Sequence, residues 1–347
     1  EDELIGINGR SAYPILSNYT YEDGTKPIQT EIQRMRTVNW GIPIQTLLTY
    51  IQPQILTAYN LPLPKVNPDI ETPVNTGYIA QLEKKAKGFT VLIESTSGGN
   101  GSGVIIAKEG KTYTVVTADH VLCEKVAAEP TCADFTYNVV TSDGKRSKIE
   151  KNTIIRQEGV DLAVFRFESQ ENYPIAELGN YTPNTNDIVF VAGYPKIGER
   201  PPVWEFNGGG AEDKEGGLLQ TRQSDLESQG SAGLKGATSL TGGYELVYSS
   251  ITYGGMSGGA VLDASGRVIG IHGRSEGGEV GRIQLGLSLG IPIGTLIGLQ
   301  DKFKANLGLL ATAPAEITPQ QQQELVEAIN KIKIPETNAR AEIWIER

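Results

Sequence analysis

The strongest constraint on the fold is a series of short runs of β-branched and aromatic residues, separated by residues that favour turns. The runs are 90–94, 102–107, 113–118, 161–167, 187–192, 245–251, 259–262 and 267–272. The 347 residues include 41 glycines and 18 prolines, and few stretches show a helical repeat. Many short strands with turn signals between them are typical of a barrel or sandwich, not of alternating strands and helices. The pattern predicts an all-β domain.

A partial internal repeat connects the two ends of the sequence. Residues 4–10 resemble residues 268–274, and residues 40–47 resemble residues 289–296. Because both blocks occur in the same order, we interpret residues 1–50 as the tail of an upstream copy of the domain. Residues 51–77, rich in proline and asparagine, are expected to form a linker.

The main domain is expected to cover residues 78–300, with a short helix at 76–87 and another at 295–307. Within it, the polar and glycine-rich residues 207–243 predict a long loop. Residues 301–347 are expected to form a helical extension, in which Thr318 and Pro319 open a helix. The last nine residues resemble the start of a tetratricopeptide repeat, which would add protein partners; a plain terminal helix fits equally well.

Charge and composition exclude several classes of function. The formal net charge of −10 argues against a sequence-independent nucleic-acid binder, which needs a basic surface. No stretch approaches 18 consecutive apolar residues, so no transmembrane helix is expected. With only two histidines the chain cannot build a multi-histidine metal site, and we expect neither a metal nor another cofactor.

Three polar residues lie next to predicted strands, in positions that would suit a catalytic role. His120 follows an apolar strand, Asp161 opens another, and Ser257 lies between glycines ahead of a third, with separations of 41 and 96 residues. A serine hydroxyl needs an adjacent base to act as a nucleophile, and histidine can take its proton near neutral pH. A buried aspartate fixes the imidazole tautomer, and flexible glycines let backbone N–H groups converge on an oxyanion.

With these motifs the sequence resembles the trypsin-like (chymotrypsin-clan) serine endopeptidases over about residues 78–300. The matching segments are 117–120, 161–164 and 255–259. The resemblance implies two six-stranded antiparallel β-barrels, hydrolysis of a protein or peptide substrate, and a site in the cleft between the barrels. It assigns His120 as general base, Asp161 as its orienting acid and Ser257 as nucleophile, with the N–H groups of Gly255 and Ser257 as oxyanion hole. Similar bacterial proteins with tandem copies are often exported, which favours an extracytoplasmic location.

Other assignments remain open beside this one. Asp119 adjoins His120 and could orient it, although neighbours on a strand point to opposite faces. Met256 stands where zymogen-activated relatives carry an aspartate, and a thioether cannot pair with a new N-terminal ammonium, so we expect no trypsin-type activation. A protease-fold binding or scaffold module with little or no catalysis is the alternative function.

The substrate pocket is expected to include Thr252, His272 and Ser275. Thr252 and His272 resemble residues that line the primary pocket in glutamyl endopeptidases of the same clan, and Ser275 could add a hydroxyl. An imidazole with hydroxyls can bind a carboxylate, which predicts a preference for acidic residues at the cleavage site. A histidine that fills the pocket floor without acidic preference is an equal alternative.

Cys123 and Cys132 are the two cysteines of the chain and lie nine residues apart, around a loop just after His120. A disulfide between them would close that loop. Two free thiols are the alternative, while a zinc site lacks further ligands nearby.

Overall fold

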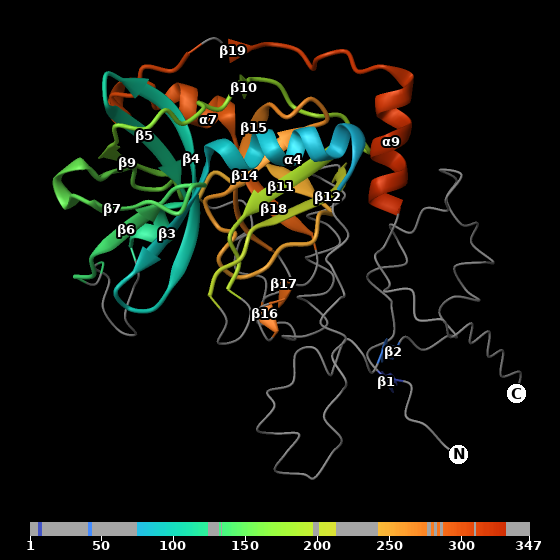
Figure 1. Cartoon of the computed structure of the whole chain (residues 1–347), viewed down its shortest axis with the longest axis horizontal. Coiled ribbons are helices and arrows are strands. Elements are labelled where there is room, and N and C mark those ends of the chain that lie inside the picture. The colour runs from blue at the N-terminus through green and yellow to red at the C-terminus, as the bar shows by residue number, and fades with distance from the viewer. Residues whose placement is uncertain are drawn as a thin grey trace, which may run out of the picture. The chain divides into compact units, whose positions relative to one another are not determined.

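The computed structural model describes residues 6–8, 41–43, 75–123, 132, 134–196, 201–212, 242–275, 279–280, 283–284, 287–308 and 310–330. The chain divides into two compact units, one of Glu1–Val74 with Asn330–Arg347 and the other of Asn75–Ile329. Most of the described residues belong to the second unit, which consists of two barrel-like sheets with a few short helices (Figure 1). The all-β prediction is therefore confirmed.

The first sheet follows the predicted β-branched runs closely. Its strands are antiparallel in the order β7-β6-β3-β4-β5-β9-β8, with β7 and β9 approaching each other across the opening. Buried Val116, Val164 and Phe165 show why β5 and β9 read as continuous apolar runs in the sequence. The strands are β3 (Thr90–Ser95), β4 (Asn100–Glu109), β5 (Thr112–Thr117), β6 (Tyr137–Val140), β7 (Arg146–Ile149), β8 (Ile155–Arg156) and β9 (Ala163–Glu168).

The second sheet closes on itself. Its six main strands pair antiparallel in the order β14-β11-β12-β13-β18-β15, and β14 also pairs with β15. They are β11 (Ile188–Gly193), β12 (Glu205–Glu212), β13 (Leu246–Tyr248), β14 (Ala260–Asp263), β15 (Val268–Ser275) and β18 (Ser288–Pro292). Two short strands, β10 (Leu178–Gly179) and β19 (Leu310–Ala311), add to it in parallel, so the sheets hold seven and eight strands rather than six each.

Strand β12 occupies part of the segment predicted as a loop, and that prediction was wrong for residues 207–212. Gly208, Gly209 and Gly210 resemble loop residues, but in the strand Gly209 allows a close approach to the segment that follows β13. A Cβ on Gly209 would lie 2.4 Å from the backbone nitrogen of Ser250. The remainder of the predicted loop up to residue 241 lies outside the described residues.

The helices lie on the outside of the two sheets. Helix α4 (Gly77–Phe89) contacts β3 and β4 of the first sheet and β11 of the second, and it buries Leu82, Ala86 and Phe89 (Figure 1). The helix predicted at 295–307 is instead two short helices, α7 (Ile293–Gly298) and α8 (Gln300–Phe303). Between them Leu299 leaves helical geometry, and Lys304 then ends α8 in a left-handed conformation with φ of 50°.

Residues after 300 contribute to the second unit as well. In α9 (Pro319–Asn330), Leu325 is fully buried, and Glu324 accepts a hydrogen bond of 2.7 Å from the backbone nitrogen of Tyr78 at the start of α4. The nine final residues, which suggested a tetratricopeptide repeat, lie outside the described part of the chain.

In the other unit, the described residues form a two-stranded antiparallel pair, β1 (Gly6–Asn8) with β2 (Gly41–Pro43). Its register equals that of the corresponding residues of β15 and β18. Gly6 faces Pro43 and Asn8 faces Gly41, as Gly270 faces Pro292 and His272 faces Gly290. The repeat seen in the sequence is thus accompanied by the same strand pairing.

Candidate active site

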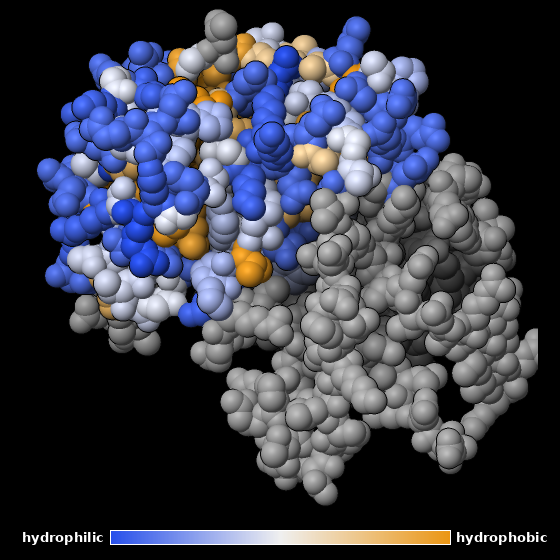
Figure 2. Space-filling view, in the orientation of Figure 1, coloured by the Kyte–Doolittle hydropathy of each residue, from blue (hydrophilic) through white to orange (hydrophobic). Residues whose placement is uncertain are grey.

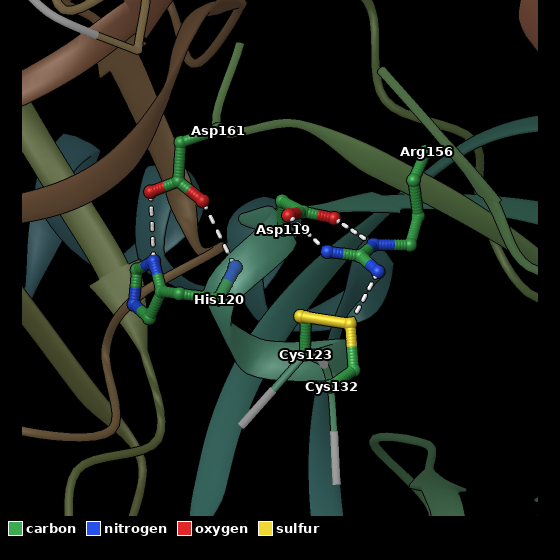
Figure 3. The surroundings of a disulfide bond; sticks show 6 residues. All are labelled: Asp119, His120, Cys123, Cys132, Arg156 and Asp161. Carbon is green, nitrogen blue, oxygen red and sulfur yellow. Dashed lines mark hydrogen bonds and ion pairs between the residues drawn. A yellow bond between two sulfur atoms is a disulfide. The ribbon is translucent and has the colours of Figure 1, made fainter. Parts of the chain in front are cut away.

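His120 lies directly after β5, in the single helical turn α5 (Asp119–Leu122). Val121 and Leu122 are buried and hold the turn against the first sheet, while the His120 side chain remains 47% exposed. Asp119 and His120 were expected on a strand, but they belong to this turn. Their side chains still point apart (Figure 3).

Asp161 precedes β9 and faces the histidine. Its Oδ2 atom lies 2.7 Å from Nδ1 of His120, and its Oδ1 accepts a 2.9 Å hydrogen bond from the backbone nitrogen of the same residue (Figure 3). The Tyr244 hydroxyl also donates to Oδ2. Burial acts to raise the pKa of Asp161, but hydrogen bonds and charge from His120, together with Tyr244, hold this pKa below its ordinary value.

Asp119, the competing acid, is bound elsewhere. Its carboxylate accepts two hydrogen bonds from the guanidinium of Arg156, one of them 2.6 Å long between Nη2 and Oδ2. Cys123 and Cys132 form a disulfide, and Arg156 also contacts the sulfur of Cys132 (Figure 3). Asp119, Arg156 and the disulfide therefore hold the α5 turn in place from the side opposite Asp161.

Ser257 lies between two glycines that could not be replaced by residues with a side chain without backbone strain or a steric clash. Gly255 and Gly258 have φ of 101° and 83°, and a Cβ on Gly258 would lie 2.1 Å from the carbonyl oxygen of Ser102. The Ser257 hydroxyl donates a 2.8 Å hydrogen bond to the carbonyl of Gly273. Among the described residues this is its one hydrogen bond, so the structure joins His120 to Asp161 but not to the serine.

The segment before Ser257 has the features of an oxyanion site. Within the described part of the chain, the backbone N–H groups of Gly255 and Ser257 donate to no protein acceptor. The Gly255 peptide is held by Ser102, whose hydroxyl donates to its carbonyl at 2.9 Å. Asn100 lies beside it and donates a 2.6 Å hydrogen bond to the carbonyl of Tyr194. Met256 is fully buried in the second barrel, which fits an apolar residue there.

The expected pocket residues lie along β15 and the loop before Ser257. His272 is fully buried on β15, with Nδ1 2.6 Å from the hydroxyl of Tyr248. Thr252 is also buried, and its hydroxyl is 2.9 Å from that of Ser288. For Ser275 the backbone is described, and it pairs with Ser288 on β18. His272 and Thr252 thus flank β18.

Four residues of this region were missed by the sequence analysis: Tyr244, Arg156, Asn100 and Ser102. Each acts through a contact with residues distant in the sequence, such as the 83 residues between Tyr244 and Asp161. The local sequence contains no signal for Arg156 either, because its partner Asp119 lies 37 positions earlier.

Among the described residues, no group of three or more histidine, cysteine, aspartate or glutamate side chains could hold a metal ion. None of the described helices has the length and apolar character needed to cross a bilayer.

Known proteins share part of this sequence and its fold. Residues 101–271 match the sequence model of the trypsin-like peptidase domain. Among solved structures, the HtrA-type protease AlgW with a tripeptide is similar at 22% identity and a TM-score of 0.48, and the match covers 66% of this chain and 64% of that one. A serine endoprotease from Yersinia pestis is similar at 20% identity and a TM-score of 0.43, covering 67% and 68% of the two chains.

This chain therefore spans less than two thirds of the length of the AlgW chain. A search of the curated proteins found no match to the sequence. The matched model describes a domain of peptidases, and the two sheets provide the corresponding architecture. We conclude that the described unit, which includes the residues matched by the trypsin-like peptidase model, has the trypsin-like fold with two barrel-like sheets.

Proposed function

We propose that this protein is a serine endopeptidase in which Ser257 is the nucleophile, His120 the general base and Asp161 the acid that orients it. The observation that carries the proposal is the His120–Asp161 pair, in which both carboxylate oxygens accept hydrogen bonds from the histidine. Since Nδ1 donates to Asp161, the other ring nitrogen, Nε2, has the lone pair that a base needs.

The reaction proceeds through an acyl-enzyme. The Ser257 oxygen attacks the substrate carbonyl carbon while its proton moves to His120, and the N–H groups of Gly255 and Ser257 stabilise the negative oxygen. The C–N bond then breaks as His120 returns the proton to the leaving amine. Water, activated by the same histidine, hydrolyses the ester and releases the acid product and the serine.

The hydroxyl of Ser257 must first turn away from the carbonyl of Gly273. This requires rotation about one side-chain bond and the loss of one neutral hydrogen bond, with a cost on the order of 1 kcal/mol. A cost of that size lowers the rate by less than about tenfold and does not prevent catalysis.

A fluorophosphonate probe tests the proposal directly, because it reacts with an activated serine and leaves a mass adduct. We expect the adduct on Ser257 in the wild type and its loss in Ser257→Ala and His120→Ala. Ser265→Ala is the matched control, since among the described residues the Ser265 side chain forms hydrogen bonds only with Asp263, in its own turn. Absence of labelling in the folded wild type would favour the scaffold alternative instead.

We also propose that the pocket prefers glutamate or aspartate on the acyl side of the scissile bond. Thr252, His272 and Ser288 place hydroxyls and an imidazole in this region, and Tyr248 fixes the orientation of the imidazole. The neighbouring Ile251 is 58% exposed and offers no counter-charge to a basic side chain.

Peptides that differ only at that substrate position decide the matter. We expect glutamate substrates to be cleaved fastest, with an advantage that decreases in His272→Ala. Faster cleavage of leucine, alanine or valine substrates would instead assign His272 to the buried floor of the pocket, in line with its full burial.

Residues 1–50 are proposed to be a partial second copy of the end of the domain. The common register of β1–β2 and β15–β18 supports this assignment. Asn8 takes the place of His272 in that copy, so the two copies differ in the residue proposed to bind the substrate carboxylate.

A further inference from the structure

Tyr244 lies just before β13 and is buried to 3% exposure, against the segment that carries the triad acid. Its hydroxyl donates to Oδ2 of Asp161, the same oxygen that faces Nδ1 of His120. The guanidinium of Arg274 lies 4.8 Å from the centre of its ring. The tyrosine thus connects the second barrel to the acid at the edge of the first.

The ring occupies the space that a side chain at position 273 would need. A Cβ on Gly273 would lie 2.1 Å from Cε1 of Tyr244 and 2.3 Å from its hydroxyl oxygen. Gly273 is a strand residue whose φ is not positive, so its lack of a side chain is explained by this close approach and not by backbone strain.

The backbone next to Tyr244 holds Asp161 as well. The nitrogen of Asp161 donates a 2.9 Å hydrogen bond to the carbonyl of Gly242, and Val160 forms a parallel bridge with the same glycine. The segment from Gly242 to Tyr244 therefore contacts Asp161 through both its main chain and a side chain.

We propose that Tyr244 is a positioning residue of the peptidase, which holds the Asp161 carboxylate in the orientation that accepts both N–H groups of His120, and that Gly273 provides the space for its ring. This inference rests on the proposed function. Without the hydroxyl, Asp161 would retain its two bonds to the histidine but could rotate about its side-chain bonds.

The tyrosine is suited to act as a permanent donor. Burial, followed by the nearby charge of Asp161, raises the pKa of Tyr244 far above its usual range, so its hydroxyl keeps the proton at any working pH. A donor that stays neutral stabilises the carboxylate without adding a second positive charge beside His120.

The internal repeat contains the same pair of residues at this point. Gly9 and Arg10 correspond to Gly273 and Arg274, although His272 is replaced by Asn8. The Gly-Arg pair is thus present in both copies, while the preceding pocket residue differs. The contacts of Gly273 and Arg274 with the ring of Tyr244 would account for this.

The test compares Tyr244→Phe, which removes only the hydroxyl, with Tyr173→Phe as matched control. Tyr173 is also buried and contacts a carboxylate, that of Asp143 at 3.2 Å, in the first barrel away from the site. We expect Tyr244→Phe to lower kcat about tenfold with little change in KM, as for one hydrogen bond to a charged group. Tyr173→Phe should leave both constants unchanged.

A second readout does not require turnover. The chain has two histidines, so the ring signals of His120 and His272 can be followed by NMR and assigned with a His120→Gln variant. When Oδ2 of Asp161 loses one donor, it becomes a stronger acceptor for Nδ1 of His120, so the proton signal of that N–H group should move to lower field. Arg274 and the Asp119–Arg156 pair also face this group, but they are the same in both proteins.

The outcomes separate this inference from the proposed function. If Ser257 is not labelled by the fluorophosphonate, the peptidase proposal fails, while the His120 signal still reports on Tyr244. A Tyr244→Phe protein with wild-type kcat and an unmoved Nδ1–H signal of His120 would overturn the inference. Gly273→Ala should lower kcat with Tyr244 present and have little further effect in Tyr244→Ala, and equal losses in both backgrounds would refute the role given to Gly273.

Discussion

Replacing Asp161 by asparagine is the most discriminating change to the site, because each described hydrogen-bond partner of this carboxylate is a donor. Oδ1 faces the backbone N–H of His120, and Oδ2 faces its ring and the Tyr244 hydroxyl. An asparagine has one oxygen and one NH2 group. At either the Oδ1 or the Oδ2 position, the NH2 group would therefore face a group that donates a hydrogen bond to Asp161 in the wild type.

The backbone N–H cannot change its role, but the imidazole and the hydroxyl can. We therefore expect the asparagine oxygen at the Oδ1 position and its NH2 group facing the ring of His120. The ring then accepts at Nδ1 and carries its proton on Nε2, which makes it unable to take the proton of Ser257. For this wrong tautomer we expect kcat to fall by about four orders of magnitude, or roughly 5 kcal/mol.

The assay is turnover of a peptide substrate between pH 5 and 9, with folding checked by circular dichroism. Asp119→Asn is the matched control, since it makes the same change in the adjacent acid, which binds Arg156 instead. For a partly exposed ion pair we expect a loss below about tenfold. The reasoning is refuted if Asp161→Asn stays within tenfold of the wild type, or if Asp119→Asn is the more damaging change.

Three other outcomes follow from the structure. Reducing the Cys123–Cys132 disulfide, or replacing both cysteines by serine, should lower the free energy of unfolding by about 2–3 kcal/mol, as measured by urea denaturation; an unchanged midpoint would show that the bridge does not constrain the unfolded chain. Because the pKa of Asp161 is lowered on folding, its ionisation stabilises the protein above its unfolded pKa of about 3.9, and this contribution is lost as pH falls through the lower folded value. The difference in unfolding free energy between wild type and Asp161→Asn should therefore shift in favour of the variant below about pH 4, and a constant difference from pH 6 to 3 would contradict this. Leu325→Ala should cost about 2–5 kcal/mol because this side chain is fully buried, with exposed Gln323→Ala as control, and equal melting temperatures for the two variants would show that α9 does not contribute to the core.

The parts of the fold that the sequence predicts are those with a local signal. Strand β5 stands out because most of its residues are β-branched and buried, and β9 because it begins with buried apolar residues. Strand β12 was missed because Gly208–Gly210 look like a loop, and the contact that favours glycine at position 209 involves Ser250, 41 positions further on. A single helix was predicted where α7 and α8 are separated at Leu299, because the sequence there contains no proline to mark the break.

For the site, residue types and their order pointed to His120, Asp161 and Ser257, and the structure adds how they are held. Which acid faces the histidine depends on Arg156, whose pairing with Asp119 joins residues 37 positions apart. The hydrogen bond from Ser257 to the Gly273 carbonyl depends on a side-chain rotamer, which residue order does not encode. Tyr244 was missed for a similar reason, since nothing near it in the sequence indicates that Asp161 lies beside its hydroxyl.

Closure of the second barrel reduces the tendency of this protein to associate with other molecules through its strand edges. Strand edges with unpaired N–H and C=O groups are templates for aggregation, and the β14–β15 pairing removes such edges from the six main strands. The described edges that remain are short: β19 and β8 have two residues each, and β7 has four. In β7 the alternate residues Arg146 and Lys148 are exposed, and the described part of the surface in Figure 2 is mostly hydrophilic. Charged and short edges disfavour pairing with a neighbouring molecule, so the described domain is protected against edge-to-edge association even in a concentrated solution.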